Sequence, residues 1–352
     1  MEFSEFKEKF TSDIAERLYD IGIEAKVSNH DVSKLNESYE SVTVTPEGSN
    51  VGVNLNINRI YDAIENGETY EGALKRAVET IERGIEETPA VDVTALTDYS
   101  QMKERLVMEV VSVEVNKEML KDIPHKEMED MAVVYRFDLG GDKDNRATVL
   151  VTNQLMNSMG ITADQLHNDA MENAPNIRPA VIRGMTEVIA EMSGMTPEDL
   201  VEMGMALGGG EEMMYVASSA DNISGAGVIA YEDFMNQAAE RVGGDFFILP
   251  SSRHEVLLVP DDGTKSLKEL EAMVKDVNAT QVSPEDKLTD SVYHYDSKNK
   301  IFELGEKFVS RMQDKESVLD SIKEKKKEIA AKEPKKDEVA KTAAKTKGGE
   351  SL

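Results

Sequence analysis

Residues 251–255, Ser-Ser-Arg-His-Glu, place hydroxyls, an imidazole and a carboxylate next to one another in the chain. A serine activated by a histidine is a basis for nucleophilic hydrolysis, so Ser251, Ser252, His254 and Glu255 are the candidate catalytic residues. On one strand, however, Ser252 and His254 would lie about 6.6 Å apart, whereas a nucleophile and its base need about 2.6 to 3.2 Å. The Gly-x-Ser-x-Gly turn that exposes a nucleophilic serine is also missing. We therefore expect a structural role for His254 and keep a hydrolase using Ser252 and His254 as an alternative.

Four other patterns resemble functional motifs, but each lacks a feature that its motif requires. His254 and Glu255 begin like the zinc motif His-Glu-x-x-His, whose second histidine is missing. Residues 225–230, Gly-Ala-Gly-Val-Ile-Ala, have the form of a dinucleotide fingerprint but lead into a predicted strand instead of a helix. Residues 140–146 and 263–266 fail as a calcium loop and a phosphate loop because required residues are missing or misplaced. The remaining histidines are scattered and cysteine is absent, so we predict neither a metal site nor a cofactor.

A predicted β-hairpin must position the candidate residues. Two apolar runs, 246–249 and 256–259, flank them, and the proline after the first run removes an amide where the ladder should end. Because the second run is apolar on both faces, we predict a central strand that is covered on two sides. Apolar residues at helical spacing predict helices before and after the hairpin, at 231–242 and 266–278.

The rest of the chain predicts an α+β protein of several small modules, each made of a sheet and helices. Residues 1–89 predict an N-terminal module with the order α-β-β-β-α-α, and residues 90–207 predict a middle α+β module rich in helices. A glycine-rich stretch then marks a boundary. Beyond it, residues 213–304 predict the order β-β-α-β-β-α, with the second strand at 227–230. Residues 305–352 predict a charged helix and a basic, largely disordered tail that is too polar to bury a core.

Methionine is concentrated between Met185 and Met214, where seven thioether side chains occur. Such side chains fill irregular cores and also form adaptable binding surfaces. The stretch therefore predicts either core packing or a soft surface for a partner helix, and of the two we favour the core.

Charge is distributed unevenly along the 352 residues, whose net charge is −28. Residues 311–352 carry 12 Lys and Arg against 9 Asp and Glu, which leaves 28 against 59 for residues 1–310. Because an acidic body repels phosphates, we expect no direct nucleic-acid binding by it. The same charge keeps open a second alternative, an anti-restriction-like protein whose ordered carboxylates mimic a nucleic-acid surface.

The sequence also bears on where the protein acts. No apolar run approaches the about 18 residues that a membrane helix needs, so we predict no membrane span. The first ten residues, MEFSEFKEKF, lack the basic and apolar regions of a signal peptide. The absence of cysteine agrees with a reducing compartment. We therefore expect a cytoplasmic protein, whose oligomeric state the sequence does not determine.

Four strings together are similar to a known family: MEDMAVVYRF at 128–137, VTNQLMNSMGITADQLHNDAMENAP at 151–175, ILPSSRHEVLLVP at 248–260 and VNATQVSPEDKLTDSVYHYD at 277–296. In order and spacing they resemble the bacterial domain-of-unknown-function family 5688, and the likeness covers most of residues 3–296. The resemblance implies a cytoplasmic protein of Gram-positive gut bacteria, often encoded on a conjugative or integrative mobile element. It implies no reaction and carries over no catalytic residues.

These observations favour a non-enzymatic interaction or accessory protein of a bacterial mobile element, with protein partners. A hydrolase and an acidic nucleic-acid mimic are the alternatives. A structure discriminates between them, because a concave pocket around His254 would support the hydrolase and a linear row of ordered carboxylates would support the mimic.

Overall fold

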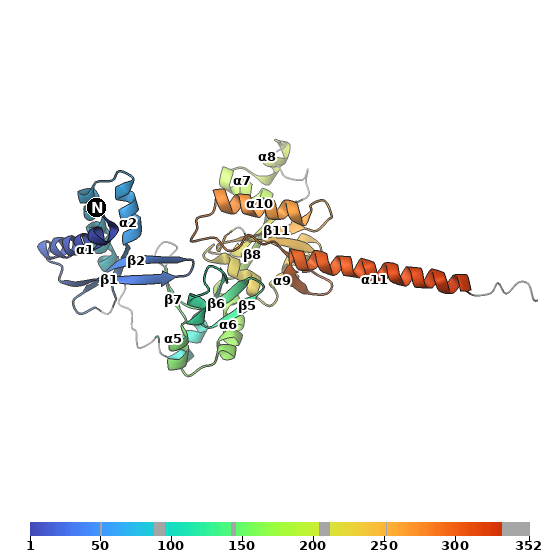
Figure 1. The fold of residues 1–352 in the computed structure, drawn as a ribbon, viewed down its shortest axis with the longest axis horizontal. Helices are drawn as coiled ribbons and strands as arrows, with labels where there is room; N and C mark the ends of the chain where they lie inside the picture. Colours follow the sequence, from blue (N-terminus) through green and yellow to red (C-terminus); the bar gives the residue numbers. More distant parts are fainter. Residues whose placement is uncertain are drawn as a thin grey trace, which may run out of the picture.

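The computed structural model describes residues 1–49, 51–87, 96, 98–141, 146–203, 212–250 and 252–332. These residues form helices and three antiparallel sheets, which is the α+β class that the sequence predicts. A module with one sheet lies at the N-terminal end, the other two sheets form a body, and a long helix projects from the body (Figure 1).

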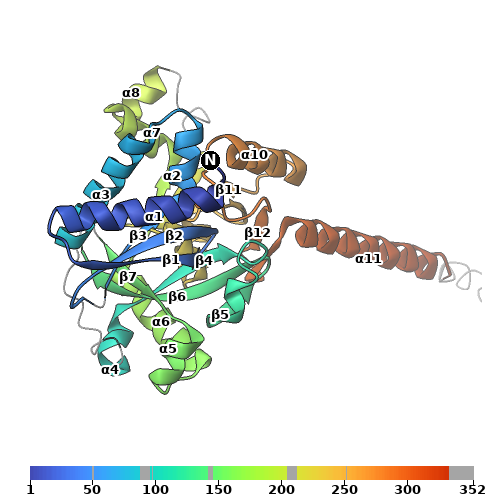
Figure 2. The same cartoon turned by 60° about the vertical axis from the view of Figure 1, so that its left-hand side comes forward.

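The N-terminal module packs three helices on a three-stranded sheet. Its elements follow the order predicted from the sequence: α1 (Phe3–Asp20), β1 (Ala25–Lys34), β2 (Glu37–Pro46), β3 (Val53–Asn56), α2 (Ile57–Glu65) and α3 (Tyr70–Glu87). Helix α1 lies across the sheet (Figure 2) because its apolar residues recur every fourth position and bury one face of the helix: Phe6, Phe10, Ile14 and Leu18. The module therefore has a core of its own.

The tip of the β1–β2 hairpin anchors this module to the body. Leu35 at the tip is buried among apolar side chains of the body: Val111, Leu120, Ile123, Ala132 and Val134. The next residue, Asn36, has a φ of 63°, which Asn tolerates better than most residues. Its backbone amide donates to Asn116 Oδ1 at 2.7 Å, and its side chain donates to the backbone carbonyls of Glu285 and Lys287. The turn at residues 35–36 thus contacts the body at two places that are far apart in sequence, near Asn116 and at residues 285–287.

The first sheet of the body is organised around β6 (Met131–Gly140). Strand β4 (Leu106–Ser112) pairs along one edge of β6, and β5 (His125–Met128) and β7 (Ala147–Leu150) pair with successive parts of the other edge. The helical elements of the described residues in this part of the chain include α4 (Tyr99–Met102), η2 (Lys103–Arg105), η3 (Met119–Lys121), α5 (Asn153–Ser158) and α6 (Ala163–Ile177).

The second sheet of the body has six strands in the order β13-β12-β10-β11-β9-β8. The strands are β8 (Ala180–Gly184), β9 (Tyr215–Ser219), β10 (Phe246–Leu249), β11 (Val256–Pro260), β12 (Tyr293–Asp296) and β13 (Ile301–Leu304). The predicted hairpin is confirmed, because β10 and β11 pair antiparallel and β11 lies between β10 and β9. The accompanying helices are α7 (Met185–Ser193), α8 (Pro197–Glu202), α9 (Phe234–Val242), α10 (Leu267–Thr280) and α11 (Gly305–Lys332).

The strand predicted at 227–230 is wrong. Gly225–Ala230 form a 3-10 helix, η4, so the C-terminal module runs β-η-α-β-β-α, and the strands β12 and β13 follow. Strand β9 already has β8 and β11 as neighbours, which leaves this segment no free edge beside it. It packs instead on β4 so closely that a Cβ at Gly227 would lie 2.4 Å from the carbonyl oxygen of Met108. The glycines therefore permit a close backbone approach.

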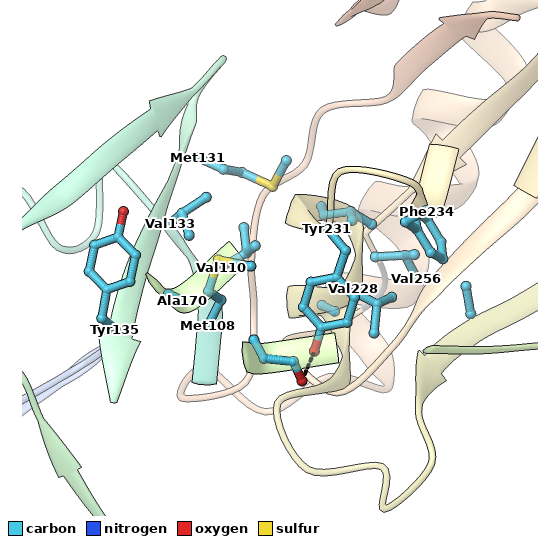
Figure 3. Close-up of a cluster of buried hydrophobic side chains, with 14 of the residues drawn as sticks. Met108, Val110, Met131, Val133, Tyr135, Ala170, Val228, Tyr231, Phe234 and Val256 are labelled. Carbon is cyan, nitrogen blue, oxygen red and sulfur yellow. Dashed lines mark hydrogen bonds between the residues drawn. The ribbon is translucent and has the colours of Figure 1, made fainter. Parts of the chain in front are cut away.

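The two sheets of the body share one hydrophobic core. Figure 3 shows residues of β4 and β6 on one side of this core and residues of η4, α9 and β11 on the other: Met108, Val110, Met131 and Val133, and then Val228, Phe234 and Val256. The hydroxyl of Tyr231 donates to the backbone carbonyl of Arg178 at 2.9 Å, which satisfies the polar end of a buried ring. Segments before and after residues 204–211 thus contribute to the same core, and β8 pairs with β9 across that stretch.

The predicted core role of the methionine-rich stretch is wrong for several of its members. Met192, Met195, Met203 and Met213 are exposed, and Met192 keeps 85 % of its surface accessible. Helix α7 buries Thr186 and Ala190, and helix α8 buries Leu200. The soft-surface alternative therefore describes these side chains better.

Helix α11 begins in the body and then leaves it (Figures 1 and 2). Its first turns are fixed by ion pairs from Arg311 to Asp296 and Glu303 and by Phe308, whose ring stacks on His294 with centroids 3.5 Å apart. Residues 333–352 lie outside the described residues and include the end of the chain, after Pro334, that the sequence predicts to be disordered; the boundary glycines at 204–210 and the turn residues 142–145 lie outside them too. In the part of the chain that the structure describes, no helix is long and apolar enough to cross a membrane.

His294 predicts a pH-dependent stability. Its side chain is fully buried, and burial lowers its pKa although Asp261, at 3.1 Å from Nε2, and the nearby Asp245 and Glu303 act in the opposite direction. The unfolded chain therefore binds a proton more readily than the folded one, and stability falls as pH drops below about 6.5. The loss amounts to about 1.4 kcal/mol for each unit by which the folded pKa is lowered.

The measurement is the urea midpoint at pH 7.5 and pH 5.5 for the wild type and for His294→Phe, which keeps the ring stack and cannot titrate. We expect the midpoint of the wild type to fall more between the two pH values. Equal falls in both proteins would assign the pH dependence to other groups.

Candidate functional site

A pocket of about 540 Å³ lies where the hairpin tip of the N-terminal module meets the body. Six cationic side chains line it: Lys34, Arg59, Arg136, Arg146, Arg178 and Arg253. Five of the twelve arginines of the chain thus converge on one cavity in a protein whose net charge is −28. A larger hollow of about 920 Å³ is lined by residues of α11 alone, so it is the side of a helix and brings no distant residues together.

The floor of the pocket is a buried ion network. Asp138 on β6 accepts hydrogen bonds from Arg146 Nε at 2.7 Å and from Arg178 Nη2 at 3.1 Å. Asp221 accepts from Arg146 Nη1 at 2.6 Å, and Arg178 Nη1 donates to the carbonyl of Ile223. Burial would raise the pKa of Asp138, but Arg146 and Arg178 outweigh it and hold that pKa below its usual range. The floor is therefore charged, and its two carboxylates are paired with two guanidinium groups.

One atom of this floor has no hydrogen-bond partner among the described residues. The side chain of Arg178 is only 2 % exposed, and its Nε lies 3.8 Å from Asp221, too far for a hydrogen bond. A buried donor without a partner costs free energy. Such a donor beside a cavity is a natural contact for a bound anion.

One wall of the pocket is the pair of Glu109 on β4 and Arg136 on β6. Arg136 Nε donates to Glu109 Oε2 at 2.8 Å, and Ser224 donates its hydroxyl to Glu109 Oε1 at 2.8 Å. Burial would raise the pKa of Glu109, but the charge and hydrogen bond of Arg136 outweigh it and the pKa lies below its usual range. Arg136 also donates to Thr148 Oγ1 from Nη1 at 3.3 Å, which leaves its Nη2 without a described partner.

The mouth of the pocket is formed by both parts of the molecule. Arg59 on α2 bridges Glu37 and Glu285, each at 3.0 Å, while Lys34 at the end of β1 makes no ion pair with a described residue. Opposite them, Arg253 follows β10, and its Nε lies 3.5 Å from Asp286 Oδ1. Among the described residues, the guanidinium of Arg253 donates no hydrogen bond to another side chain or carbonyl. Among the described guanidinium groups that line the pocket, that of Arg253 therefore has the most unused donors.

The chain can be placed in a family at this point. The model of a family of unknown function, DUF5688, matches residues 3–297. The chain belongs to DUF5688. The matched region contains every residue that lines the pocket, whereas the whole of α11 lies beyond it. No curated protein and no solved structure matches this DUF5688 chain.

Among the predicted site residues of this DUF5688 protein, Ser252, His254 and Glu255 lie beside Arg253, which lines the pocket, and we call residues 252–255 its rim. Ser251 lies outside the described residues. The hydroxyl of Ser252 accepts a hydrogen bond from the backbone amide of His254 at 3.1 Å, so its described bond is not with the imidazole ring. The ring of His254 is 39 % exposed, and its Nε2 lies 3.2 Å from Asp286 Oδ1. The backbone carbonyl of Glu255 accepts a hydrogen bond from the backbone amide of Ser252.

Hydrogen bonds of the backbone fix the shape of this rim. The amide of Arg253 donates to the carbonyl of Asp286 at 2.8 Å, and its carbonyl accepts from the amide of Ala226 at 3.1 Å. The carbonyl of His254 accepts from the hydroxyl of Ser218 at 2.7 Å. Arg253 and His254 are thus held against three neighbouring segments, and Arg253 lines the pocket while His254 lies beside it.

Sequence reasoning missed most of the pocket. The cationic residues come from β1, α2, β6, the segments beside β7 and β8, and the loop after β10, and no spacing along the chain connects them. Two of them, Arg136 and Arg253, do lie inside strings that carried the family resemblance. Within the described ranges, no group of three His, Asp or Glu side chains is placed to hold a metal ion.

Proposed function

We propose that this DUF5688 protein is a non-enzymatic interaction protein that holds an anionic group of its partner in the arginine pocket. Arg253 carries the proposal. Its guanidinium lines a cavity, faces Asp286 at 3.5 Å and donates no hydrogen bond to another described residue. A guanidinium with unused donors is suited to bind carboxylate or phosphate oxygens in a bidentate manner.

The charge balance of the pocket supports binding of an anion more than binding of a cation. The acids that line it are occupied: Glu109 by Arg136, Glu37 and Glu285 by Arg59, and Asp286 by Arg253 and His254. The hydrogen-bond donors that remain unused are those of the Arg253 guanidinium, Nη2 of Arg136 and the ammonium of Lys34. The acidic surface of the protein repels anions, whereas an anion that fits the pocket contacts these donors. The pocket should therefore bind such an anion and select it against others.

The test is a calorimetric titration of the protein with inorganic phosphate at constant ionic strength. We expect saturable binding by the wild type, and a dissociation constant that rises by about tenfold or more in Arg253→Gln, because one charge-assisted hydrogen bond contributes about 1.5 kcal/mol or more. The matched control is Arg83→Gln, which removes the same charge from an exposed position of α3.

We expect the control to bind phosphate like the wild type. A loss of binding that is equal in the two variants would reduce the effect to net charge. No saturable binding by any of the three proteins, to phosphate or to acetate, would contradict the proposal.

One observation favours a hydrolase as the second candidate function. Asp286 lies 3.2 Å from His254 Nε2, and a carboxylate in this position orients a histidine base. The serine is the weak member, since the described hydrogen bond of Ser252 is with the backbone of His254. Labelling of Ser251 or Ser252 by a fluorophosphonate in the wild type, and not in a stably folded His254→Gln variant, would promote this candidate above the binding protein.

The acidic nucleic-acid mimic is the least supported candidate. It requires carboxylates in an ordered, uncompensated row, whereas the acids around the pocket are paired with arginines. The role as an accessory protein of a mobile element is carried by the family resemblance alone.

A further inference from the structure

Helices α7 and α8 expose an apolar surface that no part of the described body covers. We call residues 185–203 the methionine surface. Every residue from 191 to 199 is exposed, and the exposed large apolar side chains are Met192, Met195, Val201 and Met203. Isolated exposed apolar residues are common, but four of them on two short neighbouring helices and the residues directly beside these helices form a patch of the kind that marks an interaction site.

The methionine surface is strongly acidic. Residues 185–203 contain five acids, Glu187, Glu191, Glu198, Asp199 and Glu202, and no Lys, Arg or His. Arg183, just outside the stretch, pairs with Glu191 at 2.5 Å. Thioether side chains adapt their shape to a partner, and acids around them select a partner that is apolar on one face and basic around it.

The distal part of α11 has the complementary character. Val318, Leu319 and Ile322 lie on one face at i, i+1 and i+4 spacing and are all exposed, Leu319 by 55 %. Four lysines follow within one turn and a half: Lys323, Lys325, Lys326 and Lys327. This segment is an amphipathic basic helix without a partner in the described part of the chain.

The two surfaces of one molecule do not meet. Helix α11 is continuous over its 28 residues, or about 42 Å at about 1.5 Å per residue, and it projects away from the body that carries α7 and α8 (Figures 1 and 2). Its base is held by Arg311 and Phe308, so the distal part does not turn back onto its own body.

We propose that the methionine surface is a docking site for the distal part of α11 from a second copy of this chain. Leu319 and Ile322 lie on the thioether side chains, and the lysines after them lie against the acids of α7 and α8. If two copies exchange their helices the contact closes as a dimer, and if each copy binds a different neighbour it continues as a chain of molecules.

The test is sedimentation velocity of the full chain at about 50 mM and about 500 mM salt, since screening weakens contacts between exposed charges. We expect association at low salt, with a species of at least twice the monomer mass of 38.9 kDa, and a shift towards monomer at high salt. Leu319→Asp should weaken the association about tenfold or more, because it removes a buried leucine from the contact.

Charge reversal tests whether the acids of the methionine surface pair with the lysines of α11. Glu187→Lys with Glu202→Lys should weaken the association at least about fivefold, and so should Lys325→Glu with Lys326→Glu. All four positions are exposed, so the variants should fold normally. An equimolar mixture of the two double variants should associate again, because the reversed surface of one fits the reversed helix of the other. Glu79→Lys with Glu82→Lys on α3 is the matched control and should associate like the wild type.

Three results would overturn the proposal. The first is a monomer at low salt at every concentration. The second is an association that Leu319→Asp leaves unchanged, which would place the contact elsewhere. The third is a mixture of the two double variants that stays monomeric although each double variant folds.

Discussion

Replacing Asp138 with asparagine should lower the free energy of unfolding by about 3 to 5 kcal/mol, because removal of one partner leaves buried charges without compensation. Asp138 is the only carboxylate described within hydrogen-bonding distance of Arg178, whose side chain is 2 % exposed, and it also binds Arg146. An asparagine keeps the shape of the side chain and one acceptor but loses the negative charge. The guanidinium of Arg178 then stays buried with a more distant carboxylate, Asp221, at 3.8 Å.

Urea denaturation at pH 7 measures this loss. The matched control is Asp276→Asn, which makes the same change at an exposed position of α10 and should alter stability by no more than about 0.5 kcal/mol. A loss below about 1 kcal/mol in Asp138→Asn would mean that the network relaxes around the lost charge, and would contradict the expected cost of a buried charge without compensation.

Leu258→Ala should destabilise the protein by about 2 to 5 kcal/mol, the range for a fully buried leucine truncated in a core. Leu258 on β11 is fully buried, pairs with Ile248 on β10 and Tyr215 on β9, and belongs to the core that joins the two sheets of the body. The cavity left by the side chain would lie at the centre of that core, where the surrounding strands cannot move in to fill it.

The neighbouring residue is the control for this prediction. Leu257 points to the other face of β11, is partly exposed and packs at the edge of a smaller cluster. We expect Leu257→Ala to lower the free energy of unfolding by less than Leu258→Ala does, when both are measured by thermal or urea denaturation. Equal losses at both positions, or a larger loss at Leu257, would contradict the assignment of the core to the Leu258 face.

Local patterns predicted the elements whose residues form one continuous apolar face. The alternation and turn residues around 246–260 identified both strands of the central hairpin, and the spacing of Phe6, Phe10 and Ile14 identified α1. In each case the pattern repeats within one element, so the residues near it in sequence are sufficient to recognise it.

Prediction failed where the chain depends on distant partners. The segment 227–230 has strand-like composition, but β9 has no free edge for it, and Gly227 packs closely on β4 instead. The sequence does not predict strand β12, because Tyr293, His294 and Asp296 bury polar side chains whose partners Asp130, Asp261 and Arg311 lie on other segments. Burial of polar residues cannot be inferred from polarity alone.

The candidate site shows the same limit. The serine and histidine stand out because they are neighbours in sequence, and they lie at the rim. The pocket itself depends on arginines that are spread between residues 59 and 253 and brought together by both sheets of the body and the N-terminal hairpin. Their signal in the sequence is weak, because arginine is mostly a surface residue and none of these arginines stands out on its own.

The most direct test of the binding role is a crystal structure of the protein with tungstate, an oxyanion whose position is identified by its anomalous scattering. We predict a tungstate in the pocket within hydrogen-bonding distance of Arg253, with further donors from Arg136 or Lys34, and its disappearance in Arg253→Gln. Tungstate bound only at other surfaces of a well-ordered crystal, with the guanidinium of Arg253 closed on Asp286, would contradict the proposal that this pocket binds an anion.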